Sequence, residues 1–563
     1  MRPLFPPQHD FLSPSVTRPN SMHMHMPSSM LVVFPVVVHQ FHSIFSTSTS
    51  TSTMSLSLLV CLLGILSLTH AVPPPTGFLI DCGASNQTHD GALLWIPDDG
   101  FIYTGTKATL PSPHPLRPTL STLRHFTAAH KHCYTFPVIK GSRYLLRTTY
   151  FYGSFDNLTS PPVFDQIIDG TKWSTVNTTF AYSKGLSSYY EIIISASGKT
   201  LSLCLVRNKH TEPDRSPFIN AIELEWLPDS LYNATDFSKY ALSTIAHHWF
   251  GGSEPVIKYP EDKFNRFWQP FTTSRYQEVR SKVEALETDF WNLPPNKVFE
   301  NGLAAKEKDG IRLQWPALEL PRASYYVALY FQDERSNGNW RVFDIVVNGK
   351  VFYKGLNVTT AGVNVFAAQW LLEGATQIEL HPVAGSEVGP IINAAEMFQL
   401  LVLHGRTVTR DLIAMEDLAR SLNNPPPDWR GDPCMPKENS WKGVTCSDGD
   451  HIRVLSLNLT GFGLSGKIPP SIANLTAIKS IWLGNNNLTG SLPDLKPLKE
   501  LVSLHLENNN FGGNIPRSWG YLDNLQEIFL QNNNLKGSMP LSLTQKTGIN
   551  LKITPGNHIT RRA

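Results

Sequence analysis

Several signatures of enzymes and of nucleic-acid-binding proteins are missing from this sequence. Its 48 basic and 46 acidic side chains leave a net charge of only +2, and no run of lysine or arginine occurs. Nucleic acid and acidic partners are therefore not indicated, because they require a concentrated positive field. No kinase-type glycine loop, Walker motif or dinucleotide fingerprint is present. We predict no cofactor and no metal site.

Long apolar runs are scarce, and one short run indicates secretion. Residues 56–68 (LSLLVCLLGILSL) form an apolar core, followed by the small residues of a cleavage site at Thr69-His70-Ala71. This core is too short to span a bilayer, so we predict a signal peptide over 54–71. Residues 1–53 are interpreted as an over-extended gene model or, alternatively, as a disordered leader. No spanning run follows Pro540, so we expect a secreted, extracellular protein, or one held at the plasma membrane through a partner.

Cysteine is sparse too, with six in 563 residues, one of which leaves with the signal. Cys434 and Cys446 stand 12 residues apart, immediately before a set of repeats. We predict a disulfide between them, because an oxidising compartment permits it and the end of a repeat array needs sealing. Cys82, Cys133 and Cys204 are odd in number, and their pairing is left open.

Eight Asn-x-Ser/Thr sequons accompany the signal. Each one alone is weak evidence, but together with a secretory signal they predict that several carry N-linked glycans. The asparagines are Asn86, Asn157, Asn177, Asn233, Asn357, Asn458, Asn474 and Asn487.

Four stretches near the C-terminus repeat one pattern with a period of 23 or 24 residues. The period and the pattern L-x-x-L-x-L-x-x-N-x-L indicate leucine-rich repeats, whose units bury their apolar faces only against one another. The stretches are VLSLNLTGFGLSGKIP (454–469), IKSIWLGNNNLTGSLP (478–493), LVSLHLENNNFGGNIP (501–516) and LQEIFLQNNNLKGSMP (525–540). We predict a linker and cap over 406–450, four repeats over 451–545 and a tail over 546–563.

Two kinds of position inside the repeats have a predicted role. One asparagine per repeat is expected to bury its amide and satisfy backbone groups at the corner after the strand. Side chains between the leucines point to the concave face, where one column contains Asn458, Trp482, His505 and Phe529. We predict that Trp482, His505 and Phe529 bind a protein partner, although rings that only shelter one another would give the same pattern. The buried asparagines are Asn486, Asn509 and Asn533.

Residues 77–405 contain short β-type runs separated by Gly, Pro, Asn and Asp rather than helical patterns. Such spacing is typical of antiparallel sandwiches. The order of strand, loop, Val-Phe-Asp, strand and turn occurs twice, over 141–173 and over 325–354. The predicted fold class is therefore mainly β, with two sandwiches over 77–235 and 240–405, followed by the short repeat solenoid.

Several motifs resemble the tandem malectin-like ectodomain of plant receptor-like kinases, among them GFLIDCGA (77–84), FDQIIDGTKWSTV (164–176) and YPEDKFNRFWQPF (259–271). WRGDPC (429–434) with WKGVTC (441–446) resembles the bridge that such receptors place before their repeats. The resemblance implies jelly-roll sandwiches in an apoplastic module that senses glycan or peptide signals. The family's usual transmembrane helix and kinase are absent from the given sequence, as in malectin-like repeat proteins without a kinase or in a truncated isoform.

Candidate sugar-binding residues come from both sandwiches. A neutral sugar is bound by aromatic faces and a few fixed polar groups. In the first sandwich the candidates are Tyr150, Tyr152 and Asp156 at a strand end, with Trp173 after the next turn; core packing is the alternative for at least one side of that strand. In the second sandwich the candidate is Arg335, which follows the stretch YYVALYFQDE (325–334). Animal malectin presents an aromatic pair a few residues beyond this stretch. An arginine there instead favours an acidic wall sugar or a peptide carboxylate as the ligand.

No enzyme is predicted. Adjacent acids such as Asp333-Glu334 are usually solvated, whereas a glycosidase holds two carboxylates about 5–10 Å apart across a cleft. The pair His247-His248 is expected to pack or hydrogen-bond, and no nucleophile–base pattern occurs. Two functions stay open. The first is a protein that binds cell-wall oligosaccharide through the malectin-like region and a protein through the repeats. The second is a co-receptor or decoy ectodomain that binds a peptide or a receptor kinase and has no sugar affinity.

Overall fold

The computed structural model describes residues 77–111, 117–127, 130–253, 256–280, 290–306, 309–333, 341–449 and 451–560. These residues belong to one compact unit. The predicted leader, the signal peptide and Arg335 lie outside the described residues. Within those residues, no helix has the length and apolar character that crossing a membrane requires.

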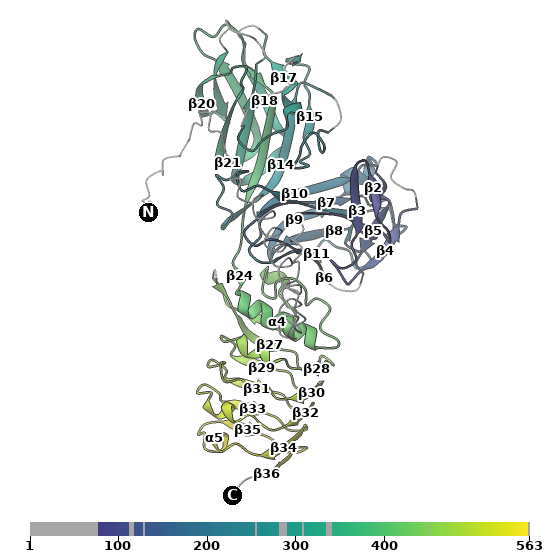
Figure 1. Cartoon of the computed structure of the whole chain (residues 1–563), viewed down its shortest axis with the longest axis vertical. Helices are drawn as coiled ribbons and strands as arrows, with labels where there is room; N and C mark the ends of the chain where they lie inside the picture. The colour runs from purple at the N-terminus through teal and green to yellow at the C-terminus, as the bar shows by residue number, and fades with distance from the viewer. Residues whose placement is uncertain are drawn as a thin grey trace, which may run out of the picture. The chain divides into compact units, whose positions relative to one another are not determined.

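One continuous sheet runs through both halves of the region before the repeats (Figure 1). Its strands follow the order β2-β3-β1-β13-β7-β10 in the first half and β14-β23-β18-β21-β19-β20 in the second, with β15 beside β14. The first six are β2 (Thr88–Asp90), β3 (Leu93–Pro97), β1 (Gly77–Asp81), β13 (Ala221–Leu227), β7 (Arg143–Tyr150) and β10 (Ser188–Ser195). The others are β14 (Tyr240–Phe250), β23 (Ala394–Val402), β18 (Ile311–Phe331), β21 (Val363–Pro382), β19 (Val342–Val347), β20 (Lys350–Asn357) and β15 (Gln269–Phe271).

The two halves are joined where β10 pairs with β14. Ile192 lies opposite Ser243, and Ile193 opposite Leu242, in antiparallel register. The mainly β fold class is confirmed, while the predicted boundary between residues 235 and 240 stays a prediction. The shared ladder means that the backbone of the sheet is continuous across that point.

Smaller sheets cover the large one. In the first half these are β6-β11-β8-β9 and β12-β5-β4, and in the second half β16-β17-β22. Their strands are β6 (Lys131–Pro137), β11 (Thr200–Arg207), β8 (Val163–Ile168), β9 (Thr171–Asn177), β12 (Phe218–Ile219), β5 (Thr122–His125), β4 (Thr106–Thr109), β16 (Gln277–Arg280), β17 (Asn301–Ala304) and β22 (Ile391–Ile392). Short helical turns connect them at η1 (Pro118–Leu120), α3 (Thr179–Ser183) and η2 (Asn296–Phe299).

Side chains from facing sheets share their cores. Tyr134 of β6 and Phe164 of β8 pack in one cluster with Leu146 of β7 and Ile192 of β10, as in a sandwich. A separate cluster fills the second half, and a third lies on the other face of the large sheet around Leu145 and its neighbours. Strand β7 is therefore buried on both faces, and its charged residue Arg147 is buried there together with carboxylates of the neighbouring strands β10 and β13.

The repeats form two parallel sheets, in the orders β25-β27-β29-β31-β33-β35 and β28-β30-β32-β34-β36 (Figure 1). The first contains β25 (Val444–Cys446), which pairs antiparallel, and β27 (Val454–Asn458), β29 (Ser480–Trp482), β31 (Ser503–His505), β33 (Glu527–Phe529) and β35 (Asn550–Lys552). The second contains β28 (Ser465–Lys467), β30 (Asn487–Ser491), β32 (Asn510–Gly513), β34 (Asn534–Ser538) and β36 (His558–Thr560). Along the chain, three strands of the second sheet, β28, β32 and β34, are each followed by a short helical segment. These segments are η4 (Pro470–Asn474), η5 (Arg517–Tyr521) and α5 (Leu541–Thr544).

Buried asparagines hold the corners of the repeats, as predicted. The amide of Asn509 donates to the carbonyls of Leu483 (2.9 Å) and Leu506 (3.2 Å), and its oxygen accepts from the backbone of Leu488 (3.0 Å). Asn486 and Asn533 make equivalent bonds. The same geometry recurs at Asn557, because β35 and β36 continue both sheets into the segment predicted as a tail. The segment keeps Leu551 and Ile553 on its strand, but its asparagine follows Ile553 by four residues, whereas Asn533 follows Leu530 by three, so the repeat pattern is broken there.

The bridge before the repeats packs on the first half of the chain. It contains β24 (Arg406–Thr407), α4 (Thr409–Ser421), η3 (Lys437–Asn439) and β26 (His451–Ile452), with β24 and β26 paired in parallel. Trp429 and Trp441 stack with their ring centroids 4.9 Å apart. The buried ammonium of Lys131 donates to the carbonyl of Asn439 (2.7 Å), and Gly431 lies against the Cys133–Cys204 disulfide.

Candidate functional site

The two tyrosines predicted to contact sugar are buried. Tyr150 is 0% exposed and Tyr152 1% exposed, and both belong to the core of the first half. The Tyr150 hydroxyl donates to Oε1 of Gln166 (2.8 Å), and that of Tyr152 donates to the carboxylate of Asp156. Neither ring offers a face to a ligand. Phe164 of β8 and Phe218 of β12 pack against Tyr150. Phe155, Tyr182 of α3 and Phe218 surround Tyr152. Burial and the Asp156 carboxylate raise the pKa of Tyr152, so this hydroxyl stays protonated.

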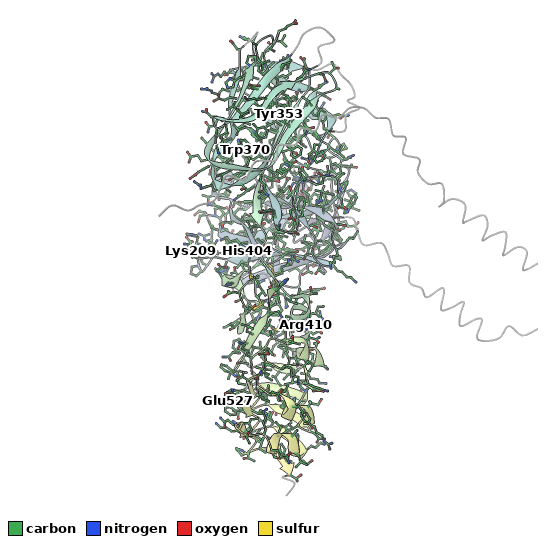
Figure 2. The ribbon with its side chains drawn as sticks, turned by 90° about the vertical axis from the view of Figure 1, so that its left-hand side faces the viewer. Lys209, Tyr353, Trp370, His404, Arg410 and Glu527 are labelled. Carbon is green, nitrogen blue, oxygen red and sulfur yellow. A yellow bond between two sulfur atoms is a disulfide. The ribbon has the colours of Figure 1, made fainter. Side chains whose placement is uncertain are left out.

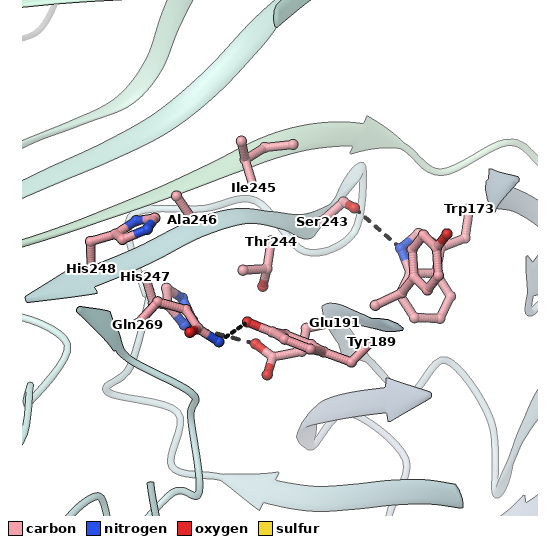
Figure 3. Close-up of a pocket in the computed structure, with 11 residues that line it drawn as sticks. Trp173, Tyr189, Glu191, Ser243, Thr244, Ile245, Ala246, His247, His248 and Gln269 are labelled. Carbon is pink, nitrogen blue, oxygen red and sulfur yellow. Dashed lines mark hydrogen bonds and ion pairs between the residues drawn. The ribbon is translucent and has the colours of Figure 1, made fainter. Parts of the chain in front are cut away.

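Trp173, by contrast, lines a cavity of about 190 Å³ where the two halves of the sheet meet (Figure 3). We call it the Trp173 cavity. Its walls come from β9, β10, β14 and β15, which are far apart in the sequence but adjacent in the fold. The indole nitrogen of Trp173 donates to the hydroxyl of Ser243 (3.1 Å), and this bond fixes the ring at the cavity wall. The lining residues are Trp173, Tyr189, Tyr190, Glu191, Ser243, Thr244, Ile245, Ala246, His247, His248 and Gln269.

Polar atoms of this cavity have unused hydrogen-bonding capacity. Oε1 of Glu191, the hydroxyl of Thr244 and both ring nitrogens of His247 are buried and make no hydrogen bond with the described residues. Buried polar atoms nearly always have a partner, so such a group of them requires an explanation. Beside His247, the amide of Gln269 donates to the hydroxyl of Tyr189 (3.1 Å) (Figure 3). The cavity therefore combines aromatic rings with free acceptors, which suits a small polar group.

A buried ionic network holds Glu191 in place behind the cavity. Arg147 of β7 contacts Glu191 (2.6 Å), binds the Glu223 carboxylate and lies with its guanidinium 3.4 Å from the centroid of the Phe267 ring. Burial raises the pKa of Glu191, and Arg147 opposes that shift. The carboxylate is thus oriented by a fixed cation, and its second oxygen lies 3.8 Å from Nδ1 of His247, another residue that lines the cavity.

His247 separates two such carboxylates. Its nitrogens lie 3.8 Å from Oε1 of Glu191 and 3.8 Å from Oε1 of Glu396, and its ring stacks on Trp268 with a centroid separation of 5.3 Å. Burial first, and then the nearby cations Arg266 and Arg147, lower the pKa of His247 well below its usual value, so the ring is neutral. Burial likewise lowers the pKa of the adjacent His248 to about 4. This second ring accepts a bond from the indole of Trp315 (3.1 Å).

The second candidate surface is the set of three rings on the repeats, Trp482, His505 and Phe529, which we call the aromatic column. The structure brings them into register on neighbouring strands β29, β31 and β33. The Trp482 and His505 centroids lie 5.5 Å apart with planes 17° apart, and those of His505 and Phe529 lie 4.2 Å apart at 14°. All three side chains are half-buried, so their outer edges reach solvent.

Polar groups fix the aromatic column from both sides. The indole nitrogen of Trp482 donates to the hydroxyl of Ser503 (2.8 Å), and Nε2 of His505 lies 3.4 Å from Oε2 of Glu527. At one end the ammonium of Lys552 lies 4.2 Å from the centroid of Phe529. The rings are thus held rigidly, which lowers the entropy lost when a partner binds them.

The predicted covalent features are placed as follows. Cys434 and Cys446 form a disulfide, Cys133 and Cys204 form a second one directly across β6 and β11, and Cys82 is a buried thiol. All eight sequon asparagines are exposed. In the described part of the chain, His, Cys, Asp and Glu side chains form no group of three that would hold a metal ion.

Sequence reasoning named Trp173 as a candidate sugar-binding residue, but it did not single out Glu191 and Thr244, which line the same cavity. Glu191 and Thr244 carry no motif, and each stands among apolar residues of a strand. The signal available was Glu191 itself, because a carboxylate within a β-branched run rarely becomes buried without a role. Its neighbours in the cavity depend on strand pairing that no single segment encodes.

Comparisons with known proteins agree with the two-part organisation. Residues 80–400 match the malectin-like domain family, and residues 500–522 match a leucine-rich repeat. A leucine-rich repeat receptor-like serine/threonine-protein kinase of Arabidopsis thaliana is 29% identical over 439 residues, which cover 75% of this chain and 50% of the relative. A receptor-like protein kinase of the same organism is 28% identical over 444 residues, covering 75% of this chain and 48% of the relative. The chain spans about half the length of the curated relatives it matches.

Among solved structures, the extracellular domain of ANXUR2 from Arabidopsis thaliana superposes with a TM-score of 0.50. The match covers 57% of this chain and 96% of that chain at 17% sequence identity. Identity this low shows a shared fold alone. The repeats and their aromatic column must therefore be interpreted from this chain alone.

Proposed function

Since this chain belongs to the malectin-like domain family, we propose that it is a non-enzymatic extracellular recognition protein whose repeats bind a protein partner. The curated relatives are named receptor-like kinases, which supports a role on the receptor side of recognition. The predicted signal peptide and the exposure of all eight sequon asparagines support an extracellular, glycosylated protein.

The aromatic column carries this proposal. Three aligned rings with exposed edges are unfavourable on a surface that meets only water, because each retains apolar area outside the core. Tryptophan and other aromatic residues are also enriched among the residues that dominate binding energy at protein interfaces. The column is rigid and lies on a regular sheet, so it can bind an extended peptide or a flat protein surface without rearrangement.

The test is affinity measurement with variants of the full chain secreted from plant cells. Cell-surface proteins captured by the wild-type protein would be purified, and their Kd measured by biolayer interferometry. Phe529→Ala is expected to weaken binding by roughly tenfold to a hundredfold, as truncation of an interface anchor costs about 2 kcal/mol. Tyr521→Ala is the matched control, because Tyr521 is 63% exposed on the repeats but lies in η5, outside the column. Equal loss of affinity in both variants would contradict the proposal.

A second candidate function, binding of cell-wall carbohydrate by the malectin-like region, is favoured by the Trp173 cavity. Aromatic rings and fixed acceptors are the groups that bind a sugar ring and its hydroxyls. At about 190 Å³ the cavity is smaller than the ~300–1,000 Å³ of common ligand pockets, so it fits one terminal sugar unit rather than a chain. Glu191 is the sole carboxylate among the lining residues that the structure describes, and glycoside hydrolysis requires two.

A glycan array probed with the full chain tests this second function. Thr244→Val removes an unused buried hydroxyl with little change of shape, so the fold should persist while sugar binding is lost. Thr376→Val is the matched control, because the hydroxyl of Thr376 is also buried without a partner among the described residues but lies on β21, outside the cavity. A flat array for the wild-type protein would overturn the carbohydrate function and leave the protein-binding proposal unaffected.

A further inference from the structure

We propose that Asn458 carries an N-linked glycan whose first sugar packs on the ring of Trp482 and closes that end of the aromatic column. Asn458 begins the sequon Asn458-Leu459-Thr460 and lies at the end of β27. The inference concerns the chain's own modification and needs no partner. It refines the proposed function by restricting where on the column a partner can bind.

The register of the sheet places Asn458 beside Trp482. The two residues pair across the parallel strands β27 and β29, and neighbouring strands lie about 4.8 Å apart. Leu457 and Ile481 point into the core, so Asn458 and Trp482 both point outward on the same face. Asn458 thus continues the row formed by Trp482, His505 and Phe529.

The other flank of Asn458 is open. The residue next to it on that side is Gly443, whose carbonyl accepts a hydrogen bond from the backbone of Asn458 (2.7 Å). A glycine has no side chain, so this neighbouring position presents only backbone to a sugar attached to Asn458. Across the sheet, Asn458 therefore lies between Gly443 and Trp482. A sugar attached to Asn458 has the backbone of Gly443 on one side and the indole ring of Trp482 on the other.

The local conformation also presents the amide for modification. Oδ1 of Asn458 accepts a hydrogen bond from the backbone N–H of Thr460 (3.3 Å), which turns Nδ2 away from the chain. The side chain is exposed, and Nδ2 donates no hydrogen bond anywhere in the ranges that the structure describes. The acceptor nitrogen is free in the geometry that the sequon requires.

The covalent step uses a lipid-diphosphate-linked oligosaccharide as donor. A bond forms between Nδ2 of Asn458 and the anomeric carbon of N-acetylglucosamine, and the bond from that carbon to the diphosphate oxygen breaks. The amide loses one proton, and the lipid diphosphate leaves. No oxidation or reduction takes place, and the eight exposed sequons make such processing of this chain the expectation.

The apolar face of the first sugar then has one aromatic partner within reach. The C–H groups of a pyranose ring pack on an aromatic face, and the indole of Trp482 is held at a fixed angle by its hydrogen bond to Ser503. At the opposite end of the column, Lys552 already covers Phe529. A glycan at Asn458 therefore leaves the edges of His505 and Phe529 as the surface open to a partner.

Hydroxyl-radical footprinting of the full chain secreted from plant cells, read by mass spectrometry, tests the contact. His505 already stacks on one face of the indole, so a sugar on the other face leaves only the edges of the ring accessible. Oxidation of Trp482 should therefore be at least about twofold slower in the wild type than in Asn458→Gln. Trp226, 40% exposed in the malectin-like region, is the internal reference for folding and dose. Wild-type protein trimmed by an endoglycosidase to one N-acetylglucosamine should keep the protection, because the first sugar makes the contact.

Paired variants separate the glycan from the side chain. Thr460→Ser retains the sequon and should protect Trp482, whereas Thr460→Ala removes it and should not. Asn487→Gln removes a glycan from the other sheet of the repeats and should leave Trp482 oxidation unchanged. An unmodified Asn458 in the glycopeptide map, or equal oxidation of Trp482 with and without the glycan, overturns the inference. Either result leaves the binding test with Phe529→Ala valid, so the two proposals fail independently.

Discussion

The buried ammonium of Lys131 lies 2.7 Å from the carbonyl oxygen of Asn439, across 308 residues of sequence. Side chains of the first half thereby contact the bridge that precedes the repeats, and they do so through a charged group out of contact with water. Burial lowers the pKa of Lys131 from 10.5 to about 8, against the opposing influence of Asp432 and Asp428. His130 is a further titratable group at this contact, within hydrogen-bond distance of the amide of Asn439.

The lowered pKa of Lys131 predicts a pH dependence of stability. Between about pH 8 and pH 10.5 the unfolded chain binds more protons at this site than the folded chain. The free energy of unfolding should therefore rise with pH across this window, by at most about 1.4 kcal/mol per pH unit. Below pH 8 both states are protonated, and the cost of burying the charge is constant.

Urea unfolding of the wild type and of Lys131→Met at pH 8, 9 and 10 measures this effect. Other lysines and tyrosines titrate in both proteins, so the difference between the two free energies isolates Lys131. The free energy of unfolding of the wild type minus that of Lys131→Met should therefore increase from pH 8 to pH 10. Parallel curves would show that the ammonium is not buried in solution.

Gly431 provides a second test of the same contact. A Cβ at this position would lie 2.8 Å from Sγ of Cys204 and 3.1 Å from Sγ of Cys133, and φ is +64°. Gly431→Ala should therefore lower the free energy of unfolding by roughly 1–3 kcal/mol through overpacking, beyond the cost of the positive φ. Gly449→Ala is the matched control, because Gly449 also has a positive φ but nothing within 4 Å of its Cβ position. Thermal unfolding that is equal for both variants would refute the packing of the bridge on the disulfide.

Arg147 should be far more important for stability than an exposed cation. Its replacement by Met leaves the buried carboxylates Glu191 and Glu223 without their cation, which costs about 3–5 kcal/mol. Lys172→Met breaks a pair with Asp165 whose lysine is 54% exposed, and it should cost less than about 1 kcal/mol. Guanidinium chloride unfolding of the full chain compares the two variants. Similar losses would mean that water reaches Arg147.

Removing the Asn509 amide should destabilise the repeats specifically. Asn509→Ala leaves the N–H of Leu488 buried without its partner. It also removes one of the two amide bonds that each of the carbonyls of Leu483 and Leu506 accepts, because Asn486 and Asn533 still donate to them. The expected loss is roughly 1–3 kcal/mol per unpaired group, seen as faster hydrogen exchange in β31 and its neighbours. Asn510→Ala, at an exposed position one residue further on, should change the exchange little. Exchange that is unchanged in both variants would contradict the role of the asparagine corner.

The repeats could be predicted closely because their information is local. Each strand, corner asparagine and turn repeats within 24 residues, and the aromatic column follows from the strand register alone. The continuation into β35 and β36 was missed because Asn557, which makes the same bonds as Asn533, stands one residue later relative to its strand than the repeat pattern requires.

The first half was harder to predict for a physical reason. Period-two alternation places Tyr150 and Tyr152 on the same side of the chain at the end of β7, but it cannot say what covers that side. The covering residues come from other parts of the chain: Phe164 of β8 and Phe218 of β12 pack on Tyr150. Tyr182 of α3 and Phe218 pack on Tyr152. The Trp173 cavity combines β9, β10, β14 and β15, so its lining exists only after the two halves of the sheet have paired.

Ser243 belongs both to the ladder between β10 and β14 and to the wall of the Trp173 cavity, where its hydroxyl holds the indole. A molecule that entered this cavity would therefore act on the same strand pair that fastens the two halves together. Occupancy and mechanical stiffness would be thermodynamically linked: a tight occupant would resist force pulling the halves apart, and such force would expel the occupant.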